Sequence, residues 1–239
     1  MRVYDWPTAD ALAGGSPHLH TASAEGYVVV RGEGTLETLS SAGFRETPLG
    51  PGTLLWFTPG TVHRLVNRSG DLELLVVMQN AGLPEAGDAV LTHPPEVLAD
   101  PRAYQRATAI PAPDEFDDTA SAHAAMSRAA RRRRDLAIEG YLALRDRVAA
   151  EGGGALADLH EAAVRLVRDK AAGWRHHWER GPLGQAEATG HHLGEIAAGR
   201  GEHLSRAAVY TADSPPGPLR NGMCGMLKVW DLDGARPLG

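Results

Sequence analysis

The sequence predicts an α+β protein in which a strand-rich N-terminal part is followed by a mostly α-helical C-terminal half. Up to about residue 92, short runs of Val, Leu, Thr and aromatic residues alternate with Gly, Pro, Asn and Ser, as in a β-sandwich or a small barrel. From residue 121 to about residue 180, apolar residues instead recur at helical spacing. We therefore expect a β domain over residues 1–92, a connecting helix and acidic linker over 93–120, and a helical region over 121–239 that ends in short strands and packs on the β domain.

The composition limits the classes of function. Of the 239 residues, 43% are hydrophobic and 23% are charged, which is typical of a globular chain. The formal net charge of −6 argues against a nucleic-acid partner, and no apolar run reaches the ~20 residues of a membrane span. With a single cysteine, Cys224, and an N-terminus that does not resemble a secretory signal, the chain is expected in the reducing cytoplasm.

The strands are predicted from their composition and from the turns between them. The expected strands cover residues 26–34, 35–40, 52–58, 63–67 and 72–79. The helical part is expected to start with 94–109, where proline stands in the first turn, and to continue from Ser121 with a break at the EGGG sequence of 151–154. Two last strands are expected over 203–213 and 225–234, separated by a loop over 214–222. They could complete the N-terminal sheet or form a small sheet of their own.

The segment SPHLHTASAE, residues 16–25, predicts a metal site. Residues i and i+2 of a strand point to the same face, so His18 and His20 share a face. The small residues of TASA suit a turn, after which Glu25 opens the next strand and shares a face with Tyr27. His63 follows a Pro-Gly turn at the start of another strand and supplies a fourth candidate ligand. Three imidazoles and one carboxylate suit a divalent transition metal such as iron, manganese, nickel or zinc.

These residues resemble the two sequence motifs of the cupin family. In the first motif, a histidine pair around one residue is followed by a glutamate and then by a glycine, as in His18, His20, Glu25 and Gly32. The second motif is matched by Gly52, Gly60, His63 and Asn67, with Thr58 where the family usually has proline. The resemblance covers roughly residues 10–92. It implies a cupin β-barrel of the jelly-roll type that holds one metal ion through His18, His20, Glu25 and His63.

The resemblance also implies a range of reactions: those of dioxygenases, decarboxylases, isomerases, epimerases, hydrolases and lyases. Tyr27 is the candidate catalytic residue, and Arg31, Arg64 and Gln79 are further polar candidates for the pocket wall. Because so few acids and bases accompany the ligands, metal-centred chemistry is favoured. We expect an enzyme that acts on a small organic molecule, with dioxygen-dependent oxidation as the leading reaction. A metal-dependent isomerase, epimerase or lyase and a non-enzymatic ligand-binding cupin stay open, and a homodimer is possible because cupins commonly dimerise.

Other patterns are more typical of structure than of function. The four arginines of 131–134 predict a solvated helix face with intrahelical Glu–Arg pairs. The adjacent histidines 176–177 and 191–192 cannot chelate one ion from a regular helix, because neighbouring side chains diverge by about 100°. Trp174 and Trp178 are expected to pack in a core or an interface, with an aromatic wall for a flat substrate as the alternative. Cys224 is expected to be a buried, inert thiol.

Overall fold

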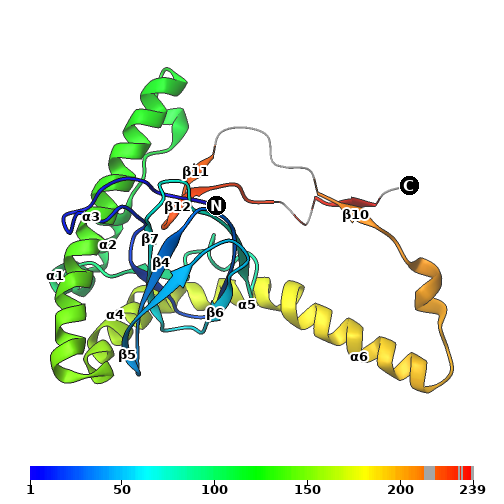
Figure 1. Cartoon of the computed structure of the whole chain (residues 1–239). Coiled ribbons are helices and arrows are strands. Elements are labelled where there is room, and N and C mark those ends of the chain that lie inside the picture. The colour runs from blue at the N-terminus through cyan, green and yellow to red at the C-terminus, as the bar shows by residue number, and fades with distance from the viewer. Residues whose placement is uncertain (213–218, 231, 233, 238–239) are drawn as a thin grey trace.

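Figure 1 shows the computed structural model of the chain, which describes residues 1–212, 219–230, 232 and 234–237. Two antiparallel sheets dominate the N-terminal part. The first sheet contains, in spatial order, β11 (Arg220–Asn221), β12 (Gly225–Leu227), β1 (Arg2–Val3), β8 (Glu73–Met78), β3 (Glu25–Arg31) and β6 (Leu54–Phe57). The second sheet contains β5 (Gly43–Leu49), β4 (Gly34–Ser40), β7 (Val62–Asn67), β2 (His18–His20) and β9 (Ala89–Leu91). The predicted class is confirmed: a strand-rich N-terminal part precedes a helical half.

The core between the two sheets follows the alternation of the strands. Tyr27 and Val29 of β3 pack there with Leu65 of β7, as strand parity predicts. The same parity wrongly places Arg31 on the inner face. The register of β3 against β8 shifts between Val29 and Arg31, and the Arg31 side chain is 52% exposed, in an ion pair with Glu73 at the surface.

The sequence reasoning missed the strand β5. Its residues GFRETPL are mostly exposed and include two charged residues and Pro48, so no alternating apolar pattern marks it. β5 lies at an edge of the second sheet and pairs only with β4. A proline is tolerated at such an edge, because one side of the strand needs no ladder hydrogen bonds.

The helices are α1 (Pro95–Ala99), α2 (Pro101–Thr108), α3 (Thr119–Glu151), α4 (Ala157–Val167), α5 (Ala171–Trp178) and α6 (Gly184–Ala197). The carboxylate of Asp118 caps α3 by accepting a hydrogen bond from the Ser121 amide at 2.8 Å. Gly152, at φ +81°, ends α3 inside the predicted break. Helical structure continues past residue 180 through a π-helical turn at Glu179–Leu183 into α6, so the predicted end was about 17 residues too early.

The helices α3 and α4 cover the outer face of the second sheet. Leu19, Leu39 and Val62 from the sheet form one buried cluster with Tyr141 of α3 and Leu159 of α4. Close approach of α3 requires a glycine at position 140, since a Cβ there would lie 2.1 Å from the carbonyl oxygen of Thr92. Trp174 of α5 is buried in the same cluster, as predicted, whereas Trp178 is 40% exposed and lies outside the core.

The arginine run of 131–134 is only half solvated, which corrects the prediction of an exposed face. Arg133 and Arg134 are 8% and 2% exposed. Arg133 donates to the carbonyl oxygen of Gly222 at 2.7 Å, and Arg134 donates to the carbonyl oxygen of Trp6 at 2.7 Å. These two side chains connect α3 to segments near both ends of the sequence, because backbone carbonyls accept from their guanidinium groups. The Nε atom of Arg133 has no hydrogen-bond partner among the described residues.

The C-terminal strands were expected either to complete the N-terminal sheet or to form a small sheet of their own, and both arrangements occur. β12 pairs with β1 and completes the first sheet, whereas β10 (Tyr210–Thr211) pairs with β13 (Arg236–Pro237) in a small separate sheet. Both predicted strands are shorter than expected, since residues 202–206 form a 3-10 helix and β12 ends at Leu227. Most of the loop predicted over 214–222 lies outside the described residues. Within the described part of the chain, no helix has the length and apolar character needed to cross a membrane.

Candidate metal centre

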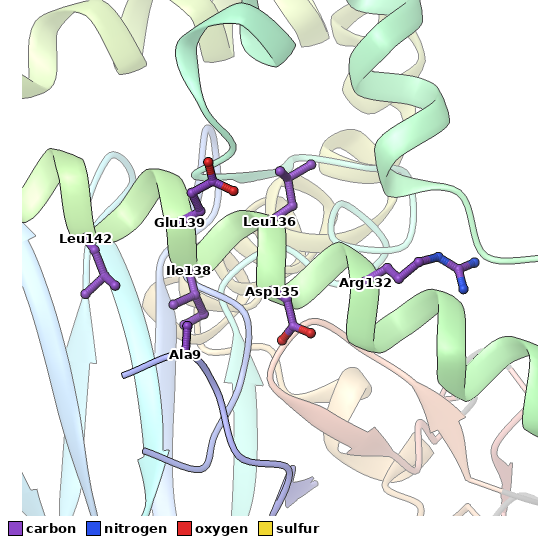
Figure 2. A pocket seen from close by; sticks show the side chains of 7 residues that line it. All are labelled: Ala9, Arg132, Asp135, Leu136, Ile138, Glu139 and Leu142. Atoms are coloured by element: carbon purple, nitrogen blue, oxygen red, sulfur yellow. The ribbon is translucent and has the colours of Figure 1, made fainter. Parts of the chain in front are cut away.

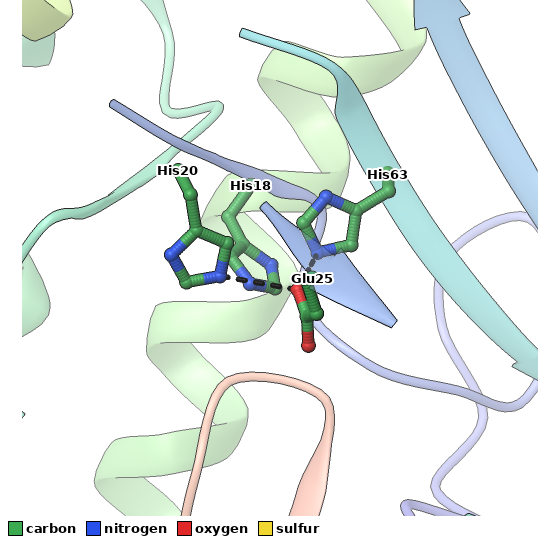
Figure 3. A group of neighbouring side chains, drawn as sticks. All are labelled: His18, His20, Glu25 and His63. Carbon is green, nitrogen blue, oxygen red and sulfur yellow. Dashed lines mark ion pairs between the residues drawn. The ribbon is translucent and has the colours of Figure 1, made fainter. Parts of the chain in front are cut away.

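Four side chains from three strands meet between the two sheets (Figure 3). His18 and His20 extend from β2, His63 extends from the neighbouring β7, and Glu25 extends from β3 of the opposite sheet. Each of them offers a nitrogen or oxygen atom, and these four atoms all lie within 4.8 Å of one another. None of the four residues is more than 6% exposed. This cluster could hold one metal ion, and it is the set that the sequence predicts.

The backbone register explains how the histidines come together. His18 on β2 is paired directly with His63 on β7, and directly paired residues present their side chains on the same face of a sheet. Glu25 opens β3 after a turn at residues 21–24, as predicted. The imidazole rings of His18 and His63 lie 4.1 Å apart between centroids.

Each histidine ring is held through its Nδ1 atom, which leaves Nε2 to face the centre. The Nδ1 atoms of His18 and His63 lie 2.9 Å from the carbonyl oxygen of Ser16 and 3.2 Å from that of Thr61. The Nδ1 atom of His20 lies 2.6 Å from a carboxylate oxygen of Asp88. A carbonyl or carboxylate oxygen can only accept, so Nδ1 carries the proton and a neutral ring keeps its lone pair on Nε2. This is how metal-binding histidines are commonly oriented.

The charges in the centre also fit a cation. The Glu25 Oε2 atom lies 3.1 Å from Nε2 of His20 and 3.2 Å from Nε2 of His63. Glu25 Oε2 and His63 Nε2 are buried without a hydrogen-bond partner in the described part of the chain. Two buried acceptors that face each other at this distance are costly unless a proton or a metal ion lies between them. The residues present therefore fit a metal ion.

The histidines of the cluster differ in their affinity for protons. Burial lowers the pKa of His18, and the neighbouring rings of His63 and His20 lower it further. Burial acts in the same direction on His20, but the neighbouring carboxylates of Asp88 and Glu25 outweigh it and raise the pKa of His20 to about 9. Burial alone would raise the pKa of Glu25, whereas His20 and His63 hold it well below its ordinary value. Without a metal ion, a proton on His20 pairs with the Glu25 carboxylate.

Asp88 is the functional residue that the sequence reasoning missed. Its side chain is fully buried, and besides His20 it accepts a hydrogen bond from the Ser23 amide at 3.0 Å. The backbone carbonyl of Asp88 accepts a hydrogen bond from the Thr21 amide at 3.0 Å. Asp88 thus fixes both the ring of His20 and the turn that leads to Glu25. The only local signal was a carboxylate directly before a buried apolar strand.

Tyr27 is the predicted catalytic residue, and it lies beside the cluster. Its side chain is fully buried, and its hydroxyl has no hydrogen-bond partner among the described residues. Burial and the nearby Glu25 carboxylate raise the pKa of Tyr27, so the hydroxyl keeps its proton. The ring of Phe57 bridges Tyr27 and the centre, with centroids 5.5 Å from Tyr27 and 4.3 Å from His63.

The other polar candidates for the pocket wall lie elsewhere. Arg31 and Gln79 are exposed. Arg64 is fully buried on the other face of β7, where it pairs with Asp10 at 2.6 Å and with Glu37 at 3.4 Å under α3. Strand parity separates Arg64 from His63, because consecutive residues of a strand point to opposite faces.

Cys224 reaches the centre from the far end of the chain. Its Sγ atom lies 4.0 Å from Nδ1 of His18, and Figure 3 shows the β11–β12 hairpin passing beside the four ligands, with α3 behind them. Burial and the Glu25 carboxylate raise the pKa of Cys224, which agrees with the predicted buried thiol. The hairpin is held by Met223, whose carbonyl accepts from the Ser16 amide at 3.0 Å. The C-terminal strands therefore help to enclose the centre.

A hollow of about 570 Å³ lies on the surface away from these residues. Figure 2 shows that its wall is formed by Ala9 and by α3 side chains between Arg132 and Leu142. None of the four candidate ligands lines it. The paired histidines at 176–177 and 191–192 belong to no cluster with metal-ligand spacing among the described residues.

A match to a protein family agrees with the position of the centre. The Cupin domain family matches residues 10–78, and no curated protein sequence matches the chain. Similar solved structures include WlaRA, a TDP-fucose-3,4-ketoisomerase from Campylobacter jejuni, at 15% identity and a TM-score of 0.31, with 38% of this chain and 64% of that chain covered. KdgF from Halomonas sp. shares 27% identity at a TM-score of 0.24, with 28% of this chain and 56% of that chain covered.

A predicted oxalate decarboxylase from Thermotoga maritima shares 23% identity at a TM-score of 0.25, with 30% of this chain and 58% of that chain covered. The chain thus spans less than two thirds of each of these structures. The matched residues 10–78 contain all four residues of the cluster. Residues 10–78, which carry this cluster, therefore match the Cupin domain family.

Proposed function

We propose that the chain is a metal-dependent cupin enzyme that acts on a small organic molecule, with dioxygen-dependent oxidation as the leading reaction. The observation that carries the proposal is the orientation of the three histidines. Each Nδ1 atom is held by an oxygen, so three Nε2 atoms are directed to one point beside the Glu25 carboxylate. A protein that fixes four donors in this way is built to bind a cation.

A divalent transition metal held by His18, His20, Glu25 and His63 would supply Lewis acidity or redox chemistry. Iron, manganese, nickel and zinc all accept such a ligand set. The neighbouring residues of the chain would determine the environment of that metal ion. Asp88 keeps His20 oriented, and the sheets exclude bulk water from the ligands, which are almost fully buried. Phe57 gives this region an apolar wall, so a compact and partly apolar substrate is favoured.

Tyr27 is the proposed proton carrier of the site. Its hydroxyl is buried, protonated and without a partner in the described structure, so it is available to donate a hydrogen bond to a bound substrate. Besides the ligands and Tyr27, Asp88 and Cys224 are the titratable side chains that contact the cluster in the described residues. A site with so few acids and bases favours chemistry that the metal ion activates.

A metal-dependent isomerase, epimerase or lyase is the second candidate. These reactions need one positioned proton carrier, and the free hydroxyl of Tyr27 meets that need. A non-enzymatic ligand-binding cupin is the third, and the enclosure of the cluster by the β11–β12 hairpin is compatible with it. A small-molecule partner and a cytoplasmic location remain predictions from the sequence.

One experiment separates the three candidates. The protein is loaded with each of the four metals in turn and screened against small organic acids, sugars and phenols, with and without dioxygen. We expect turnover that requires both the metal and dioxygen and that is lost in His63→Ala. Turnover that persists without dioxygen would favour the isomerase or lyase. Ligand binding without turnover would favour the binding protein.

A further inference from the structure

Asp88 stands at the end of a turn that contains two glycines. Residues 80–88 lie between β8 and β9, and Gly82 and Gly87 adopt φ values of +88° and +86°. Within the turn, the Asp88 amide donates to the carbonyl oxygen of Leu83 at 3.2 Å. Glycines lower the stiffness of such a connection, so its conformation depends on the elements that pack against it.

The start of the helix α5 supports this turn through two hydrogen bonds. Lys170 directly precedes α5 and Trp174 lies four positions later, so both side chains are on one side of the helix. Trp174 donates from its indole nitrogen to the carbonyl oxygen of Ala86 at 3.1 Å. Lys170 donates to the carbonyl oxygen of Gly87 at 3.2 Å.

The same side of α5 also contacts the beginning of the turn. His177 follows Trp174 by three positions, and a Cβ at position 82 would lie 2.7 Å from the Nδ1 atom of His177. The turn can approach the helix this closely because residue 82 is glycine. Leu83 and Trp174 belong to one buried apolar cluster. α5 therefore supports the turn from Gly82 to Gly87.

The two carbonyl groups that α5 holds belong to the two peptide groups directly before Asp88. A peptide group is planar, so holding both carbonyls orients the backbone from which the Asp88 side chain extends. That side chain lies 2.6 Å from Nδ1 of His20 and accepts a hydrogen bond from the Ser23 amide at 3.0 Å. A continuous series of contacts thus connects α5 with a candidate metal ligand.

We propose that Trp174 and Lys170 are positioning residues of the metal centre and act on His20 through Asp88. The inference rests on the proposed binding of a metal ion by the chain. It gives the helical half a role in the metal centre, although that half and Asp88 both lie outside the residues 10–78 that match the family. Direct partners of metal-binding histidines typically contribute about 10–100-fold to metal affinity. A residue that acts through such a partner should contribute less.

Two variants remove the two hydrogen bonds separately. Trp174→Phe removes the indole N–H and keeps an aromatic ring in the core. Lys170→Met removes the ammonium group from an exposed side chain, so it tests the proposal even if Trp174→Phe does not fold. Trp178→Phe is the matched control, because it makes the same substitution on the same helix at a side chain that is 40% exposed. Urea unfolding measures the stability of each variant.

The first measurement is amide hydrogen exchange in the metal-free protein. The Ser23 amide reports on Asp88, because the Asp88 carboxylate accepts its hydrogen bond. We expect faster exchange at Ser23 in Trp174→Phe and in Lys170→Met, beyond the change that the amides of β3 show. Trp178→Phe should leave exchange at Ser23 unchanged. Loss of global stability alone would change the amides of Ser23 and of β3 together.

The second measurement is the dissociation constant for Mn²⁺ or Zn²⁺, obtained by competition with a chelating dye. We expect a rise of roughly three- to tenfold in Trp174→Phe, a rise in Lys170→Met, and no change in Trp178→Phe. In an Asp88→Ala background, Trp174→Phe should have no further effect, because no carboxylate remains to be oriented.

The outcomes separate this inference from the proposed function. A wild-type dissociation constant in both variants, wild-type exchange at Ser23 in both, or an equal effect of Trp174→Phe with and without Asp88 would overturn the inference and leave the metal centre standing. A wild-type protein that binds neither ion would contradict the metal centre itself, and the inference with it.

Discussion

The Nδ1 atom of His20 lies 2.6 Å from a carboxylate oxygen of Asp88, although 68 positions separate the two residues. Both side chains are almost fully buried. The contact fixes which ring nitrogen of His20 faces the centre. It also connects the segment before β9 to the candidate metal site, so the site depends on more of the chain than the four ligands.

Asp88→Asn is expected to weaken metal binding. The amide keeps the shape of the side chain but removes the charge that makes the His20 ring a better donor. Partners of this kind typically contribute 10–100-fold to metal affinity. The dissociation constant for Mn²⁺ or Zn²⁺, measured by competition with a chelating dye, should rise by that factor. Asp71→Asn is the matched control, because Asp71 is half exposed in a surface ion pair with Arg31. Equal affinities in Asp88→Asn and the wild type would contradict the role of Asp88.

Tyr27→Phe should separate stability from activity. The hydroxyl is buried without a partner in the described structure, so its removal leaves no other group unsatisfied. The free energy of unfolding should stay the same or rise by up to about 1 kcal/mol. If Tyr27 carries the proton, turnover should fall by roughly 10²–10⁴-fold while the bound metal is retained. Loss of more than 2 kcal/mol in a denaturant titration would show instead that the hydroxyl is satisfied and structural.

The Asp10 carboxylate is expected to contribute to the free energy of unfolding, and this contribution is expected to be lost in acid. Burial would raise the pKa of Asp10, but hydrogen bonds from Arg64 and Thr8 outweigh it and lower the pKa to about 2. A carboxylate with a lowered pKa stabilises the folded state above its unfolded pKa near 3.8, and the contribution is lost as the pH falls from 4 to 2. Because Asp10 is partly exposed, we expect a contribution of roughly 1–2 kcal/mol.

Urea unfolding of Asp10→Asn and the wild type at several pH values measures this contribution. The variant should be less stable at pH 6, and the difference should shrink toward pH 2. A difference that does not change with pH would contradict the ion pair between Asp10 and Arg64.

Gly15→Ala tests whether the β11–β12 hairpin closes over the centre. A Cβ at position 15 would lie 2.5 Å from the Cα atom of Cys224, so backbone has to move. We expect a loss of about 1–3 kcal/mol in stability and faster reaction of Cys224 with a thiol reagent. Gly154→Ala is the control, since nothing lies within 4 Å of its new Cβ. Wild-type protection of Cys224 in Gly15→Ala would contradict the close contact.

The four candidate ligands could be predicted from the sequence because their placement depends on local rules. His18 and His20 share a face by strand parity, and His63 follows a turn whose glycine, Gly60, adopts φ +86°. The same rule fails at Arg31, where a register shift that depends on pairing with β8 changes the face. Local periodicity contains no information about such a shift.

The contacts of Asp88 and Cys224 with the centre, and the burial of Arg133 and Arg134, could not be predicted, because these environments come from distant segments. Cys224 is 206 positions from His18, yet their side chains are in contact. Arg133 and Arg134 stand in a run that is typical of a solvated helix, but the carbonyl groups of Gly222 and Trp6 accept their hydrogen bonds. Nothing near these arginines in the sequence identifies those acceptors.

The central claim is that His18, His20, Glu25 and His63 bind one divalent transition metal ion. It is tested most directly by elemental analysis of the purified wild-type protein and of His63→Ala, each loaded with a metal and then passed through a desalting column. We expect about one ion per wild-type chain and severe loss in His63→Ala, because three remaining donors hold the ion less tightly. His160→Ala, a histidine outside the cluster that bonds to the Gly60 carbonyl, should keep the wild-type content. A wild-type metal content in His63→Ala, or no retained metal in the wild type, would contradict the claim.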